Sequence, residues 1–113
     1  MPGFEIMILD DEEQERVLMQ RMLENEGLEI WAAGETDSAC RILEEENIKL
    51  ILLDIDLGPE AEDGFTVCKN IRSKYYTTPL QIVLVSGYTD DSSLHRGLSV
   101  GADDFIKKPF SSM

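Results

Sequence analysis

Short apolar runs alternate with amphipathic stretches along the whole chain. Three of the runs, at residues 6–9, 50–53 and 82–85, are apolar throughout, which is typical of central strands in a parallel sheet covered on both faces. The run at residues 29–33 is more mixed and suits an edge strand, and a short fifth run lies at residues 105–106. We therefore expect five strands in one sheet.

The four intervals between these strands show helical periodicity. A strand–helix unit repeated four times and closed by a last strand gives a doubly wound α/β sheet. We favour the flavodoxin-like strand order 2-1-3-4-5 over half of a Rossmann fold. Residues that commonly cap or stop helices mark the helix ends; they are Gly27 after the first helix, Thr36 and Asp37 for the second, Asp63 for the third, and Asp90 and Asp91 for the fourth.

Composition narrows the classes of function. The chain has 113 residues, of which 42% are apolar, and this fits one domain spanning residues 1–113 with a single core. Its net charge of −13 repels nucleic acids and anionic membranes, so we expect no direct binding to either. No apolar run approaches the ~20 residues of a membrane helix, and the start lacks the layout of a signal peptide, so we expect a cytoplasmic protein. Cys40 and Cys68 have no neighbouring histidine, and we expect reduced thiols that fill the core.

Polar residues follow four of the five predicted strands. Asp10 and Asp11 follow the first strand, Asp54 the third, Ser86 the fourth and Lys108 the fifth. Ligands of open α/β sheets gather beyond the carboxyl ends of the strands, so these side chains should share one crevice. Two carboxylates ~4 Å apart repel by about 4 kcal/mol at an effective dielectric constant near 20. A hard cation such as Mg²⁺ relieves that repulsion, and a carboxylate beside it can attack a phosphoryl donor.

Each of these residues also has an ordinary structural interpretation. Asp10 and Asp11 begin an acidic run of the kind that favours a helix N-terminus. Ser86 lies where turn residues are common, and Lys108 alone is typical of a solvated surface. Asp54, directly after an apolar strand, could simply end that strand. Their convergence at one sheet edge is what favours a functional site.

Taken together, these residues resemble the receiver domain of the two-component response-regulator family, with its CheY-like sheet, over about residues 4–110. Each motif alone is weak, but the set is specific. The motifs are Ile8-Leu9-Asp10-Asp11-Glu12, Leu52-Leu53-Asp54, Val85-Ser86-Gly87, Gly101-Ala102-Asp103-Asp104-Phe105 and Lys108-Pro109-Phe110.

The resemblance implies the chemistry of the acidic residues. Asp54 would be the phosphoacceptor. Asp11, Asp54 and the backbone carbonyl of Asp56 would bind Mg²⁺ directly, and Asp10 would help through water. The phosphoryl group would come from a histidine kinase, a phosphotransfer protein or a small phosphodonor. The domain would assist its own phosphorylation and dephosphorylation as a regulatory module, and it would not be a turnover enzyme.

The resemblance also implies how phosphorylation is read. Ser86 and Lys108 would contact the phosphoryl group, and Phe105 would turn inward when Ser86 moves. Tyr88 would flank the group together with Asp56. The peptide bond between Lys108 and the following proline would be cis.

The chain departs from the family pattern in two places. Two additional residues separate Asp54 from Asp63, which affects the carbonyl assigned to Asp56. Members of the family continue into a fifth helix, whereas only three residues follow Phe110 here. We expect that the chain is a fragment of a longer regulator or hybrid kinase, or that a partner or second copy covers the apolar sheet face left bare.

Two other classes share part of this pattern. The spacing of Asp54 and Asp56 resembles the start of haloacid-dehalogenase-type phosphatases, in which the first aspartate is phosphorylated and the second is an acid/base. A flavodoxin-like module for a phosphorylated cofactor shares the order of elements, but its phosphate loop follows the first strand. Asp10 and Asp11 would be unexplained in the phosphatase and would repel the phosphate in the cofactor module.

Overall fold

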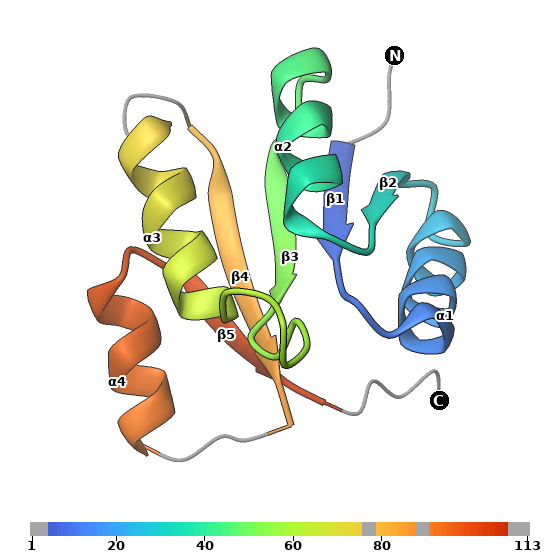
Figure 1. Cartoon of the computed structure of the whole chain (residues 1–113). Coiled ribbons are helices and arrows are strands. Elements are labelled where there is room, and N and C mark those ends of the chain that lie inside the picture. The colour runs from blue at the N-terminus through green and yellow to red at the C-terminus, as the bar shows by residue number, and fades with distance from the viewer. Residues whose placement is uncertain (1–4, 76–78, 88–90, 109–113) are drawn as a thin grey trace.

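A computed structural model of the chain describes residues 5–75, 79–87 and 91–108. Strands and helices alternate along it, as the sequence pattern predicts (Figure 1). The elements are β1 (Glu5–Leu9), α1 (Glu13–Glu24), β2 (Glu29–Ala33), α2 (Thr36–Glu45), β3 (Leu50–Asp54), α3 (Gly64–Lys74), β4 (Gln81–Ser86), α4 (Asp91–Ser99) and β5 (Asp104–Lys107).

The five strands form one parallel sheet in the order β2-β1-β3-β4-β5. This confirms the predicted 2-1-3-4-5 order and the edge position of β2. The three runs that are apolar throughout become the three central strands, because both of their faces are covered. Residues of β2 are mostly half-exposed, which explains its mixed composition.

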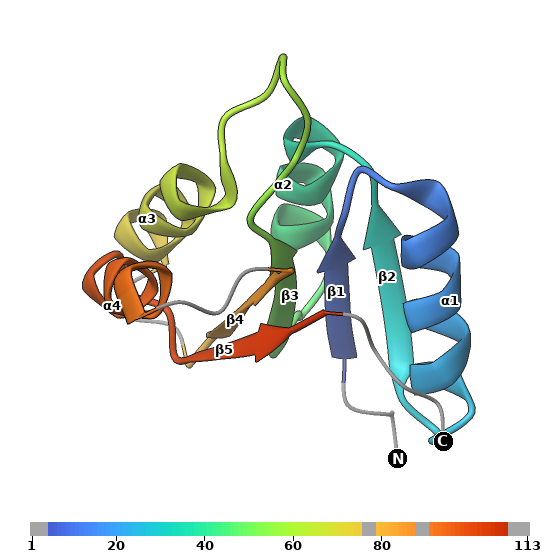
Figure 2. The same ribbon diagram turned by 90° about the horizontal axis from the view of Figure 1, so that it is seen from below.

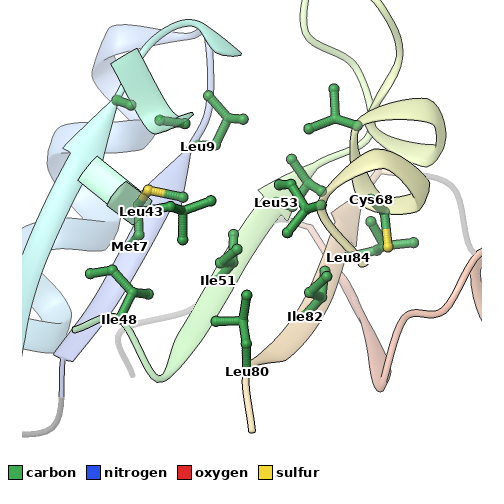
Figure 3. Packing of buried hydrophobic residues seen from close by; sticks show 14 of the residues in the cluster. Met7, Leu9, Leu43, Ile48, Ile51, Leu53, Cys68, Leu80, Ile82 and Leu84 are labelled. Carbon is green, nitrogen blue, oxygen red and sulfur yellow. The ribbon is translucent and has the colours of Figure 1, made fainter. Parts of the chain in front are cut away.

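The two faces of the sheet carry different helices (Figure 2). Successive residues of a strand point to opposite faces. Met7, Ile51 and Leu84 belong to the larger core cluster, which includes buried residues of α2 and α3; Figure 3 shows this packing. Ile8 and Val83 pack on the other face in a smaller cluster with Met19 of α1.

Among the described helices, α1 lies alone on its face of the sheet, and an open apolar groove remains beside it. The groove has a volume of about 360 Å³. Ile106 of β5, 36% exposed, is one of its walls. The other walls are Ile6, Met19, Met22, Leu23, Leu50, Leu52 and Val83. The expected bare apolar sheet surface is therefore present in the described part of the chain.

Side-chain capping agrees with the prediction at one helix and differs at another. Asp63 caps α3, and its carboxylate accepts a hydrogen bond from the Thr66 amide at 2.9 Å. The prediction that Thr36 and Asp37 cap α2 is wrong, because both already have helical positions and Glu35 is the extended residue before them. The carboxylate of Glu35 accepts from the Ser38 hydroxyl and caps no backbone amide of α2.

The remaining predictions concern thiols, membrane spans and three residues that are not described. Cys40 and Cys68 are both free, but only Cys68 is buried in the core as expected, whereas Cys40 is half-buried and outside the core clusters. Burial raises the pKa of the Cys68 thiol to about 11. No helix in the described ranges is long and apolar enough to cross a membrane. The cap at Asp90, the position of Tyr88 and the Lys108–Pro109 peptide bond lie outside the described residues.

Candidate functional site

Four parallel neighbouring strands deliver polar residues to one edge of the sheet. Asp10 follows β1, Asp54 ends β3, Ser86 ends β4 and Lys108 follows β5. The first three are buried, with exposed fractions of 0%, 5% and 4%. The edge holds a cleft of about 770 Å³. Its walls are Asp11, Glu12, Glu15, Asp54, Ile55, Asp56, Leu57, Gly58, Asp63, Ser86, Gly87 and Lys108.

Backbone hydrogen bonds continue the sheet pairing just beyond the strands. The Asp10 amide donates to the carbonyl of Ala33 at 3.1 Å, and the Lys108 amide donates to the carbonyl of Ser86 at 2.7 Å. These bonds hold the residues that follow β1 and β5 in line with the sheet. The positions of Asp10 and Lys108 are therefore set by strand pairing and not by loop conformation.

The ammonium group of Lys108 lies among three carboxylates. Its Nζ is 2.6 Å from Glu15 Oε2, 2.8 Å from Asp54 Oδ2 and 3.6 Å from Asp10 Oδ2. Burial disfavours the charged amine, but the hydrogen bonds to Asp54 and Glu15 and the negative charges nearby outweigh it and raise the pKa of Lys108. Lys108 therefore stays protonated and neutralises part of the acidic centre.

Asp10 is the most deeply buried acid of the centre. Its Oδ1 accepts a hydrogen bond from the Glu12 amide at 2.9 Å, whereas Oδ2 is buried without a hydrogen-bond partner. Burial raises the pKa of Asp10 to about 7, and the negative charge of Asp54 acts in the same direction, while the Glu12 amide and Lys108 oppose them. A buried carboxylate oxygen that accepts no hydrogen bond, and whose ion pair with Lys108 is as long as 3.6 Å, is suited to a cation or to a water bound to one.

The loop after β3 orients Asp54. Oδ1 of Asp54 accepts from the Asp56 amide at 3.1 Å, and Asp56 Oδ1 in turn accepts from the Gly58 amide at 3.1 Å. Gly58 has φ +105°, a conformation that L side chains rarely adopt. The loop ends at Gly64, where the Cβ of any larger residue would collide with the carbonyl of Asp54. Glycine therefore allows the first residue of α3 to pack directly against the end of β3.

The carboxylates of the cleft fit a divalent metal ion. Oxygens of Asp10, Glu15 and Asp54 lie within 4.8 Å of one another. Asp11 lines the same cleft and is largely exposed. Partial loss of solvent raises the pKa of its carboxyl group, and the negative charges of Asp54 and Asp56 raise it further. Oxygen donors with excess negative charge are what Mg²⁺ and Ca²⁺ bind. The donor set therefore suits a hard cation.

The structure brings most of the predicted site residues together. Asp10, Asp54 and Lys108 are in contact, and Asp11, Asp56 and Ser86 line the same cleft. Sequence reasoning missed Glu15, which contacts Lys108. The available signal was its place in the acidic first turn of the helix that follows Asp10 and Asp11, close to the predicted site.

Phe105 lies elsewhere. It is in β5, opposite Leu84 in register, and is half-buried against the larger core cluster. A Cβ added at Gly97 would lie 3.3 Å from its ring, so Phe105 borders α4 and not the cleft described above. Its role as a switch stays a prediction.

Comparison with known proteins gives consistent matches. The family model described as response regulator receiver domain matches residues 6–113. The transcriptional regulatory protein GltR of Pseudomonas aeruginosa is 33% identical over 109 residues, which are 96% of this chain and 44% of GltR. The chain thus spans less than half the length of that relative.

Solved structures share the fold. The receiver domain of NtrX from Brucella abortus has a TM-score of 0.85 and 32% identity, over 95% of this chain and 88% of that one. A response regulator from Burkholderia pseudomallei, solved with a phosphorylated aspartic acid, a calcium ion and citrate, has a TM-score of 0.83 and 22% identity. That match covers 96% of this chain and 61% of the other, and at this identity it shows the fold alone.

Proposed function

This chain belongs to the response regulator receiver family, and from that premise we propose that Asp54 accepts a phosphoryl group in an Mg²⁺-dependent phosphorelay. The observation that carries the proposal is the carboxylate of Asp54. It is buried at the end of β3, opens onto the acidic cleft and is hydrogen-bonded to Lys108 at 2.8 Å. The phosphatase alternative built on Asp54 and Asp56 gains no support, because the matches are to receiver domains.

In the proposed reaction, a carboxylate oxygen of Asp54 forms a bond to phosphorus. The bond from phosphorus to the donor, a phosphohistidine nitrogen or an acyl oxygen, breaks, and the donor keeps the electron pair. The Asp56 amide holds the carboxylate in orientation through Oδ1. Dephosphorylation is attack of water on the same phosphorus, which restores the carboxylate and releases phosphate.

The metal ion would be held by Asp11, Asp54 and the carbonyl of Asp56, with Asp10 acting through water. When bound, Mg²⁺ supplies positive charge that neutralises the transferred phosphoryl oxygens. Two observations support a cation at Asp10 and Asp54: Asp10 Oδ2 accepts no hydrogen bond, and oxygens of Asp10, Glu15 and Asp54 cluster within 4.8 Å of one another. For Asp11 and Asp56 the support is that both line the same cleft. The Burkholderia protein, which shares the fold, was solved with a calcium ion and a phosphorylated aspartic acid, and this supports a divalent cation in the proposal.

Ser86 and Lys108 are proposed to read the phosphoryl group. Lys108 already contacts Asp54, and Ser86 lies at the end of the neighbouring strand. Contact of both residues with the phosphoryl group would favour one arrangement of α4 and β5. Phe105 is part of β5 and borders α4. The signal would thus pass from the cleft to the outer surface of α4.

We propose that the chain is the receiver portion of a longer regulator, since it spans 44% of its curated relative. The phosphoryl donor would be a histidine kinase or phosphotransfer protein in the cytoplasm. With a net charge of −13, any contact with nucleic acid would be made by another part of that regulator. A partner segment or a second copy would cover the apolar groove beside α1.

Intact-mass analysis after treatment with acetyl phosphate tests this proposal. With Mg²⁺ present, the protein should gain one phosphoryl group, and chelation of the metal should prevent the reaction. Asp54→Asn should remove the adduct, whereas Asp56→Asn, which keeps the Asp54 carboxylate, should still form it. A folded sample with Mg²⁺ that gains no phosphoryl group would overturn the proposal.

A further inference from the structure

The shortest contact of Lys108 is with a residue that the proposed reaction does not use. Glu15 Oε2 lies 2.6 Å from Nζ, closer than the carboxylate of Asp54 at 2.8 Å. Glu15 comes from α1, 93 residues away in sequence, and its side chain is 45% exposed. It has more access to solvent than the Asp54 side chain, which is 6% exposed.

Two further contacts fix the first turn of α1 beside the cleft. The Glu15 amide donates to the carboxylate of Glu12 at 2.7 Å. The Arg16 guanidinium donates to the Asp10 carbonyl at 2.8 Å, so the residue after Glu15 is tied to the loop that carries Asp10. The hydrogen bonds made by the Glu15 amide and by the next residue, Arg16, therefore fix the backbone from which the Glu15 side chain reaches Lys108.

We propose that Glu15 is a positioning residue that holds Lys108 in the unphosphorylated protein and competes with the phosphoryl group for it. The proposal rests on the proposed function, because it requires a phosphoryl group on Asp54. Oxygens of Glu15 and Asp54 lie within 4.8 Å of each other, so a phosphoryl group on Asp54 would bring added negative charge close to Glu15. Glu15 therefore disfavours the phosphorylated state in two ways, by retaining Lys108 and by repelling the anion.

Beryllofluoride, an anion whose beryllium becomes tetrahedral when a carboxylate oxygen binds it and which thereby mimics a phosphoryl group, provides the test. Its affinity is measured at saturating Mg²⁺ for the wild-type protein, Glu15→Gln and Glu13→Gln. Glu15→Gln keeps the size of the side chain and removes its charge, so it should bind beryllofluoride about five- to twenty-fold more tightly. Glu13→Gln makes the same charge change in the same first turn of α1, at a more exposed position, and should alter the affinity less than two-fold.

Two readouts separate positioning from a general effect of charge or structure. The gain for Glu15→Gln should persist at 0.5 M NaCl, where long-range charge effects are screened. In metal-free wild-type protein the Lys108 ammonium should give a slowly exchanging NMR signal, and this signal should weaken in Glu15→Gln but not in Glu13→Gln. Equal affinities for the two variants would overturn the inference.

The metal offers a competing role for Glu15. If Glu15→Gln lost Mg²⁺ affinity and bound beryllofluoride more weakly, Glu15 would be a metal ligand and the inference would be wrong. Failure of the proposed function looks different: the wild-type protein itself would then bind no beryllofluoride and form no adduct with acetyl phosphate.

Discussion

Asp10 is a carboxylic acid with no exposed surface, one hydrogen bond and one long ion pair. Its pKa is raised to about 7 from an ordinary value of 3.8, mainly by burial. Between these two values the unfolded chain releases the proton while the folded chain keeps it. The contribution of Asp10 to the free energy of unfolding of the metal-free protein therefore falls as the pH rises from about 4 to about 7.

Asp10→Asn should remove this dependence on pH. From pH 5 to pH 8, with a chelator present, the wild-type protein should lose about 2–3 kcal/mol more stability than the variant. The amide oxygen of the substituted side chain can still accept the hydrogen bond from the Glu12 amide, so the comparison is not complicated by the loss of that hydrogen bond. Urea unfolding at both pH values measures the difference, and identical slopes against pH would contradict it.

Individual site residues were predictable where strand pairing places them. Asp10, Asp54 and Lys108 each lie at the end of a strand, and parallel strands put these ends at one edge. Glu15 was not predicted, because its contact depends on the rotation of α1 about its axis and on the side-chain conformer. Glu12 and Glu13 nearby are also acidic, so the sequence does not indicate which of these glutamates contacts Lys108.

At the scale of elements, Arg72 of α3 fastens several segments together. It donates to the carbonyls of Leu80 at 2.7 Å and Gly101 at 3.1 Å and to the carboxylate of Asp103 at 2.6 Å. The same Asp103 oxygen accepts from the Ile82 amide at 2.8 Å. One guanidinium thus joins the end of α3 to the start of β4 and to the loop before β5.

Arg72→Gln should lower the free energy of unfolding by about 2 kcal/mol, because two carbonyls lose the guanidinium donor and the Asp103 carboxylate keeps only the Ile82 amide. Lys74→Gln is the matched control in the same helical turn. It breaks an ion pair with Glu44 whose side chains are 61% and 58% exposed, and such an exposed pair contributes little to the free energy of unfolding. Denaturant unfolding of both variants makes the comparison, and equal losses would contradict a fastening role for Arg72.

Element types were easier to predict from the sequence than element ends. The apolar runs of β1, β3 and β4 are buried on both faces, which is why their pattern was unambiguous. The start of α2 was misplaced because Thr36 and Asp37 have capping side chains, whereas the backbone already becomes helical at Thr36. The choice is made by backbone angles that composition does not determine.

On the scale of the whole molecule, charge is the dominant property. A net charge of −13 on 113 residues destabilises the compact state through self-repulsion. Any added salt should therefore stabilise the fold to some extent. Mg²⁺ should do more than that, since acidic groups converge on one cleft.

At ten times its dissociation constant, Mg²⁺ should raise the free energy of unfolding by about 1.4 kcal/mol beyond NaCl of the same ionic strength. Asp11→Asn, which removes a proposed ligand, should lose this additional stabilisation but keep the response to NaCl. Thermal unfolding in matched salts provides the measurement. If the two salts stabilised the wild-type protein equally, the cleft would hold no specific metal ion.

The ion pair between Glu15 and Lys108 spans 93 residues of sequence, and this has a consequence for synthesis. A chain is synthesised from its N-terminus, and a domain generally folds as a unit. The acids that follow β1 and β3 are made long before the lysine that follows β5. A nascent or C-terminally clipped copy therefore has the aspartates without the cation that engages them. Only a copy synthesised through Lys108 has all the charged groups of the centre, so under the proposed function shorter copies should be unable to use this lysine to contact a phosphoryl group on Asp54.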